Sequence, residues 1–94
     1  MTITVKFVGS LRHVSGVNEL ALAGKKCLSV REMMIEISGE LPELKQSIVE
    51  PQLETLQTNA LILVNGIEIS VLNGLETKVK DGDEIVLVPV VHGG

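Results

Sequence analysis

Residues 29–39 read SVREMMIEISG, and this stretch carries the clearest helix signal in the chain. Ser29 followed by Glu32 forms a capping box, in which each side chain accepts a backbone N–H of the other residue. The apolar residues that follow recur at the spacing of one helix face: Val30, Met33, Met34 and Ile37. Met33 and Met34 are therefore expected to fill the hydrophobic core. Gly39 is placed to end the helix in a left-handed cap, which predicts a main helix over residues 30–38.

The segments before this helix predict two strands. Residues 2–8, TITVKFV, alternate polar and apolar side chains, the period of a strand with one buried face. Residues 9–18 are rich in turn formers, so His13 is expected in a loop. Residues 19–24, ELALAG, alternate again and are expected to return as a hairpin partner of the first strand.

The segments after the helix predict three further strands. Residues 41–51 suggest a second short helix that begins at Pro42. Residues 60–69, ALILVNGIEI, contain an apolar run, an Asn-Gly turn and a short strand. A polar stretch then leads to the last strand, IVLVPVV, at residues 85–91. One main helix on a mixed sheet is a two-layer α+β domain.

The composition limits the possible functions. The chain has 94 residues, 45% of them hydrophobic, and a net charge of -4, which indicates one domain. Its one cysteine cannot form an internal disulfide, and no stretch is long enough to span a membrane, so we expect a cytoplasmic protein. Negative charge and one aromatic residue, Phe7, argue against nucleic-acid binding.

Five segments together resemble the β-grasp sulfur carriers, above all the small subunit of molybdopterin synthase (MoaD) and less closely the thiamine sulfur carrier ThiS. These segments are ITVKFVGSLRHVSG, SVREMMIEI, LILVNG, VKDGDEIVLVP and the closing HGG. The resemblance implies a ubiquitin-like fold with a mixed sheet of about five strands on one helix. It also implies that residues 1–94 form a single sulfur-carrier domain with a flexible C-terminal tail at residues 91–94.

The resemblance assigns the chemistry to the end of the chain. A ubiquitin-activating-type adenylating enzyme would use ATP to activate the Gly94 carboxylate, and a sulfur donor would convert it to a thiocarboxylate. A molybdopterin synthase large subunit (MoaE-like) would then use that sulfur to make the molybdenum or tungsten cofactor. Gly93 and His92 would complete the tail. The chain itself would be a carrier without a bound cofactor or metal, and not an enzyme.

The tail residues suit this role physically. Glycine has no Cβ, so Gly93 and Gly94 fit a channel too narrow for other residues. Residues 91–94 reach roughly 13 Å when extended, at about 3.3 Å per residue. Pro89 lacks an N–H donor, which interrupts strand pairing and frees the residues after it.

The last strand also predicts a docking surface, because its apolar residues do not alternate with polar ones. Either Ile85 and Leu87 or the three valines must point away from the helix, and an outward apolar row rimmed by polar groups favours a protein partner. We assign partner contacts to the following residues: Phe7, Arg12, Val86, Val88 and Val90.

Other readings remain open. On the same fold, a protein modifier would use Gly94 to form an isopeptide with target lysines. Another sulfur carrier would deliver its sulfur to thiamine or a different product. In a plain binding module the tail would be inert. Cys27 is expected as a small buried hydrophobe. Residues 81–84, DGDE, are expected to form a turn and not a cation site. A free-standing enzyme is disfavoured because no nucleophile-base pair, metal cluster or phosphate loop is present. An iron-sulfur protein is excluded by the cysteine count.

Overall fold

The computed structural model describes residues 2–23, 27–44 and 60–89. The helices are α1 (Ser10–Ser15) and α2 (Val30–Glu40), with 3-10 turns η1 (Pro42–Leu44), η2 (Ile69–Val71) and η3 (Gly74–Glu76). The strands are β1 (Thr2–Phe7), β2 (Glu19–Ala23), β3 (Cys27–Ser29), β4 (Ala60–Val64), β5 (Ile67–Glu68), β6 (Lys78–Lys80) and β7 (Glu84–Pro89).

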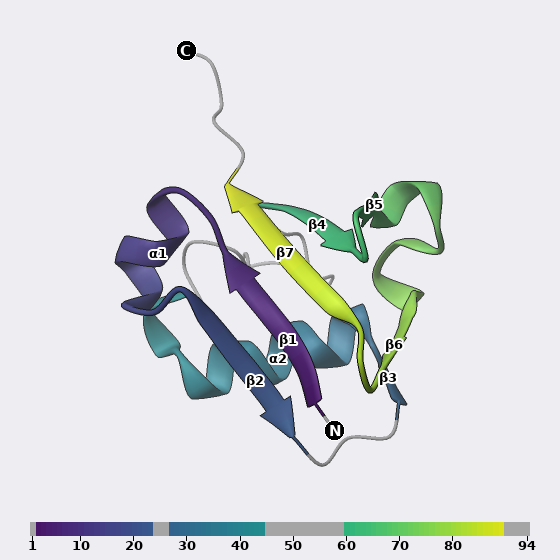
Figure 1. Ribbon diagram of the computed structural model, residues 1–94, viewed down its shortest axis with the longest axis horizontal. Coiled ribbons are helices and arrows are strands. Elements are labelled where there is room, and N and C mark those ends of the chain that lie inside the picture. Colours follow the sequence, from purple (N-terminus) through teal and green to yellow (C-terminus); the bar gives the residue numbers. More distant parts are fainter. Residues whose placement is uncertain (1, 24–26, 45–59, 90–94) are drawn as a thin grey trace.

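Five strands form one mixed sheet in the order β2-β1-β7-β4-β5, and α2 crosses one face of it (Figure 1). The central pair, β1 and β7, is parallel, and the other neighbours are antiparallel. β3 and β6 form a separate two-stranded sheet. The expected two-layer α+β architecture, with a five-strand mixed sheet on one main helix, is therefore confirmed.

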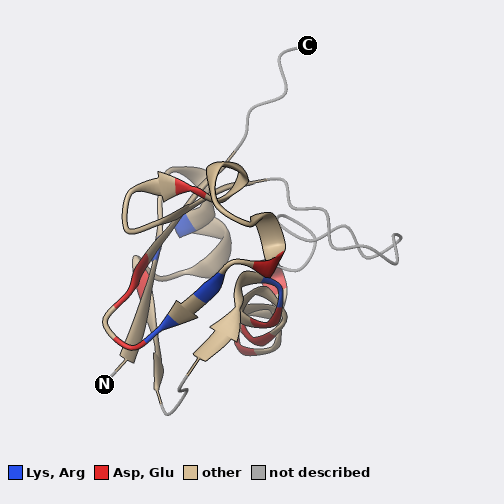
Figure 2. Cartoon of the chain, turned by 90° about the vertical axis from the view of Figure 1, so that its right-hand side faces the viewer, with Lys and Arg blue, Asp and Glu red and all other residues tan. Residues whose placement is uncertain are grey.

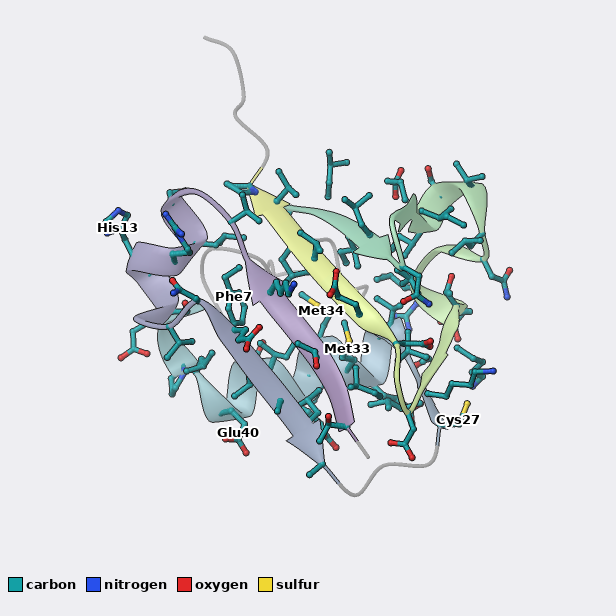
Figure 3. All side chains as sticks on the ribbon, viewed as in Figure 1. Phe7, His13, Cys27, Met33, Met34 and Glu40 are labelled. Carbon is teal, nitrogen blue, oxygen red and sulfur yellow. The ribbon has the colours of Figure 1, made fainter. Side chains whose placement is uncertain are left out.

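The core lies between α2 and the inner face of the sheet. The sheet contributes the inward residues of its two central strands, and α2 contributes the stripe expected from the sequence. These side chains are at most 2% exposed: Ile3, Val5, Phe7, Val30, Met33, Met34, Ile37, Ile85 and Leu87. Figure 3 shows Phe7, Met33 and Met34 on the inner side of the ribbon. Phe7 therefore has no exposed surface for a partner, and its assignment as a docking residue is wrong, because it shares the buried face of β1.

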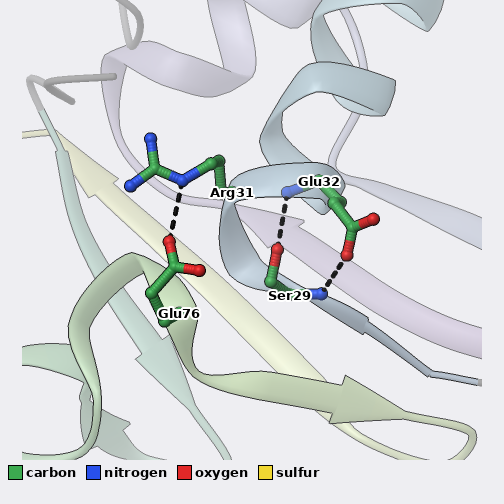
Figure 4. Close-up of polar contacts among 4 residues, drawn as sticks. All are labelled: Ser29, Arg31, Glu32 and Glu76. Atoms are coloured by element: carbon green, nitrogen blue, oxygen red, sulfur yellow. Dashed lines mark hydrogen bonds and ion pairs between the residues drawn. The ribbon is translucent and has the colours of Figure 1, made fainter. Parts of the chain in front are cut away.

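The capping box of α2 is present as expected (Figure 4). The Ser29 hydroxyl accepts the Glu32 backbone N–H at 3.1 Å, and the Glu32 carboxylate accepts the Ser29 N–H at 2.8 Å. These hydrogen bonds satisfy backbone donors that the helix itself leaves free. In the same turn, the Arg31 Nε donates to the Glu76 carboxylate at 2.8 Å and links α2 to η3. The start of the main helix is therefore fixed by local and tertiary contacts together.

Two predictions about the helices were wrong. Residues 10–15 form α1, not a loop, and the helix ends at Gly16, whose φ of 79° is a left-handed cap. α2 runs through Gly39 to Glu40, since Leu41 packs against the core and its N–H reaches the Ile37 carbonyl. The expected second short helix appears only as η1, because its remaining residues lie outside the described ones.

The pairing of β3 with β6 was also not predicted. Each strand has three residues, and Leu28 and Val79 meet at the centre of the pair as the buried side chains that point into the core. Cys27 points the other way and is exposed, so its expected burial was wrong. It lies directly opposite Lys80.

Candidate functional site

The residues assigned to the chemistry, Gly94, Gly93 and His92, lie outside the described residues, as does Val90. The structure instead defines where they are attached. β7 ends at Pro89, which pairs with Ala60 of β4. On the other side of β7, the last described backbone contact is the Val8 N–H donating to the Leu87 carbonyl at 3.2 Å. The chain is thus held in the middle of the sheet up to residue 89.

Gly9 holds the end of β7 from the side of α1. Its φ of 62° and ψ of -136° suit glycine, and a Cβ at this position would lie 3.3 Å from the Pro89 side chain. A larger residue would therefore push against the end of the strand. Because Gly9 immediately precedes α1, this close approach also places α1 beside the point where residue 90 begins.

Arg12 and His13 are both exposed on α1. Figure 3 shows His13 projecting outward from this helix. Arg12 is therefore accessible on the helix that follows Gly9. It places His13 on a helix surface and not in the expected loop.

The two faces of β7 are now distinguishable. Ile85 and Leu87 are fully buried, whereas Val86 and Val88 lie on the opposite face and are half-buried. Pairing with β4 adds Leu61 opposite Val88 and Leu63 opposite Val86. We call these four residues, Leu61, Leu63, Val86 and Val88, the outer-face patch. It leads directly to the last described residue of β7.

Sequence reasoning found the valines of this patch but missed the two leucines. Residues 60–64, ALILV, are all apolar, so their alternation between faces is hidden. The burial of these residues alternates in the structure, with Leu61 46% exposed and Ile62 only 1%. The signal that would have identified Leu61 and Leu63 is the antiparallel register with β7, which is a tertiary property.

Charged residues border the outer-face patch. Lys6 of β1 is beside Val86 and forms an ion pair with Glu84 at 3.1 Å, with both side chains about half exposed. On the other side, Glu68 is opposite Leu63. The hydroxyl and the backbone N–H of Ser70 both donate to the Glu68 carboxylate and hold its pKa below the ordinary value. An apolar centre with a charged rim is the usual anatomy of a protein interface.

The turns at the far end of the patch are locked together. The Asn65 side chain donates to the Asp83 carboxylate at 3.0 Å and accepts the Glu84 N–H at 2.9 Å. The other carboxylate oxygen of Asp83 accepts the Lys80 N–H at 2.9 Å. Asn65 and Gly66 both have positive φ, as the expected Asn-Gly turn requires. Residues 81–84 thus form a turn, as predicted, and these bonds fix the register of β4 with β7.

The described residues hold neither a cluster of metal-ligating side chains nor a helix suited to a membrane. In the described ranges 2–23, 27–44 and 60–89, histidine, cysteine and carboxylate side chains are nowhere grouped in threes that would hold a metal ion. Within the same ranges, every helix is too short or too polar to cross a membrane.

Known proteins match this chain over most or all of its length. The model of the ThiS family matches residues 5–94. The solution structure of small archaeal modifier protein 1 from Methanosarcina acetivorans is 37% identical, with a TM-score of 0.82, over 99% of this chain and 96% of that one. The BexX/CysO complex of Amycolatopsis orientalis gives 28% identity and a TM-score of 0.76, over 98% and 99% of the two chains.

A shorter match involves a putative sulfur carrier protein of Archaeoglobus fulgidus. It is 52% identical over 33 residues, which is 35% of this chain and 38% of that relative's length. The structural matches confirm the predicted ubiquitin-like β-grasp fold.

Proposed function

The chain belongs to the ThiS family of β-grasp sulfur carriers, and from this premise we propose that it carries sulfur as a thiocarboxylate on Gly94. The observation that carries the proposal is the extent of the family match, which runs to residue 94 and so includes Gly93 and Gly94. The chain is a small carrier protein and not an enzyme.

The proposed chemistry needs a partner enzyme because a carboxylate is a poor electrophile. A carboxylate oxygen of Gly94 attacks the α-phosphate of ATP, and pyrophosphate leaves. Hydrosulfide supplied by the sulfur donor then attacks the acyl carbon of this adenylate, the C–O bond breaks to release AMP, and loss of the S–H proton leaves the thiocarboxylate. Cationic groups and a metal ion in the adenylating enzyme must offset the negative charges that meet in this step.

The outer-face patch supports the proposal by supplying a docking surface. Its apolar side chains lie at the end of β7, so a partner bound to them is close to the origin of residues 90–94. The charged groups at its border, Lys6 with Glu84 and Glu68, fit the polar rim of such an interface. Arg12 adds an exposed cation on α1, the helix that begins directly after Gly9, which packs against Pro89.

We further propose that the sulfur is delivered to molybdopterin, with a MoaE-like large subunit as the second partner. This finer assignment rests on the sequence resemblance to MoaD. A second candidate is a protein modifier conjugated to lysines through Gly94, and the relative named small archaeal modifier protein 1 favours it. The activation step is the same for both.

The test of the activation step is ATP–pyrophosphate exchange with the cognate adenylating enzyme. We expect the chain to support exchange, and a variant with one alanine added after Gly94 to support none while it keeps the same fold by circular dichroism. Equal exchange by the extended variant would refute the role of Gly94.

The carrier and the modifier are distinguished after activation. For a carrier, radioactive sulfur from the donor appears in a small product, and no lysine of a cell extract becomes linked to the chain. Lysine conjugates without any sulfur-labelled small product would establish the modifier instead.

A further inference from the structure

A groove unrelated to the outer-face patch lies between β2 and α2. It has a volume of about 410 Å³ and is lined by Ala21, Leu22 and Ala23 on the strand and by Glu36, Gly39 and Glu40 on the helix. Figure 3 shows Glu40 at the end of α2 on this side of the molecule. The groove is thus formed by a strand edge on one side and carboxylates on the other.

Among the described residues, the strand edge in this groove is unpaired. β2 is the first strand of the sheet order, and among the described residues it pairs with β1 alone. The Phe7 N–H donates to the Asn18 carbonyl at 2.9 Å, so Asn18 directs its backbone groups toward β1. Since backbone groups alternate along an antiparallel ladder, Leu20 and Leu22 do the same.

It follows that Glu19, Ala21 and Ala23 direct their backbone N–H and C=O groups outward, and two of them line the groove. Such a row is a template for another strand. The opposite edge of the sheet is a poorer template for a partner strand, because β5 has only two residues and β2 has five.

The helix side of the groove determines the charge of what would bind there. Glu32, Glu36 and Glu40 follow one another at every fourth residue, and Figure 2 shows acidic positions, in red, recurring along α2. The last turn of α2 contains no basic residue, so the negative end of the helix dipole adds to these carboxylates. Glu36 already takes part in an interaction of its own, so Glu40 and the helix end supply most of the negative charge that faces a ligand.

A strand added to β2 would present every second side chain on the face of the sheet that α2 covers, at intervals of roughly 6.6 Å. One of these side chains would pass the end of α2, where Glu40 lines the groove.

Gly39 leaves the room that such side chains need. A Cβ added at Gly39 would meet no atom within 4 Å. The helix surface is thus recessed at the point where it faces the strand.

We propose that this groove binds an extended segment of a partner protein that joins the sheet as a strand beside β2 and directs a lysine or arginine toward Glu40 and the end of α2. Backbone hydrogen bonds to Ala21 and Ala23 give the affinity, and the carboxylates of α2 select basic side chains. The groove lies on the opposite edge of the sheet from β4 and β5, so the binding is independent of the chemistry proposed for Gly94.

The test uses a short capped peptide of alternating lysine and valine, added to the isotopically labelled full chain and followed by amide NMR. We expect the Ala21 and Ala23 amides to shift and become protected from hydrogen exchange. A peptide with glutamate in place of lysine should cause no shift at the same concentration. Equal binding of the glutamate peptide would overturn the proposal.

Two variants test the groove itself. Gly39→Leu places a side chain in the recess and suits a helix better than glycine does, so it should keep the fold and abolish the shifts. Glu40→Lys should weaken binding roughly tenfold by charge reversal. Val71→Lys also adds a positive charge, on the exposed surface of η2 beside the other edge of the sheet, and should leave binding unchanged.

The alternative occupants have distinct signatures. Concentration-dependent shifts of the Ala21 and Ala23 amides without peptide would assign the groove to a second copy of this chain and overturn the proposal. Peptide-induced shifts confined to Val86, Val88 and Leu61 would also overturn the proposal, because they would place the binding on the outer-face patch.

Discussion

Leu61 and Ile62 are adjacent in the sequence but face opposite sides of the sheet, so their alanine variants should separate partner binding from folding. Leu61 is 46% exposed, and Ile62 is 1% exposed. If the outer-face patch docks a partner, Leu61→Ala should impair binding and leave the fold stable. The Ile62→Ala variant should be less stable to unfolding.

The expected magnitudes follow from this burial. Ile62→Ala removes a fully buried branched side chain and leaves a cavity, which costs about 2–5 kcal/mol. Each kcal/mol lowers the Tm of a domain of this size by roughly 4–8 °C. Leu61 is already half in water, and complete burial of a leucine is worth only about 1.5–3 kcal/mol, so Leu61→Ala should cost about 1 kcal/mol. Its effect on binding should exceed 1 kcal/mol if Leu61 is central to the interface, as truncated anchor residues typically show.

The assay combines thermal unfolding by circular dichroism with calorimetric titration of the adenylating enzyme. Leu61→Ala should lower the affinity at least about fivefold with a small change in Tm. Ile62→Ala, measured below its own Tm, should bind as the unmodified chain does. The reasoning is refuted if Leu61→Ala binds normally, or if it lowers the Tm as much as Ile62→Ala does.

Three further predictions concern the elements that hold the fold. Ser29→Ala removes the cap of α2 and should lower the free energy of unfolding by about 1 kcal/mol in urea titrations with an unchanged m-value. The Ser29 backbone N–H and hydroxyl hold the pKa of Glu32 below the ordinary glutamate value, so this stabilisation is complete above that ordinary value and is lost as the pH falls through the lowered pKa. Glu32→Gln should therefore flatten the loss of stability as the pH falls below the ordinary glutamate pKa, and identical slopes would contradict the capping assignment. Gly9→Ala should destabilise more than Gly16→Ala, because both have positive φ but only Gly9 lies against Pro89, and equal unfolding midpoints would show that this contact is unimportant.

The sequence predicts the elements whose pattern is long enough to reveal a period. β1 follows from the alternation of Ile3, Val5 and Phe7, and α2 from its capping box and apolar stripe. The same alternation should have excluded Phe7 from the docking surface, since it belongs to the buried set.

Short elements escaped prediction because tertiary contacts determine them. α1 has six residues between two glycines, so local signals favoured a turn, yet Leu11 and Ser15 are buried in the structure. β3 and β6 each bury a side chain only because they pair with one another. Glycine is common at the end of a helix, so Gly39 was expected to end α2. Packing of Leu41 instead extends the helix past it.

Some residues of the candidate site could likewise be predicted from the sequence, and others required the structure. The valines of β7 were named from the sequence, but the choice of face required the burial of Ile85 and Leu87. Leu61 and Leu63 required the register of β4 with β7. The groove beside β2 depends on which strand lies at the sheet edge, and that is a property of the topology alone.

The central claim is that Gly94 carries sulfur, and intact-protein mass spectrometry tests it most directly. The chain is incubated with ATP, the cognate adenylating enzyme and a sulfur donor, and the enzyme is shown to be active on another carrier. The account predicts a mass increase equal to the replacement of one oxygen by sulfur, located at Gly94 by fragmentation and absent without ATP. An unchanged mass, or sulfur found on Cys27 instead, would contradict it.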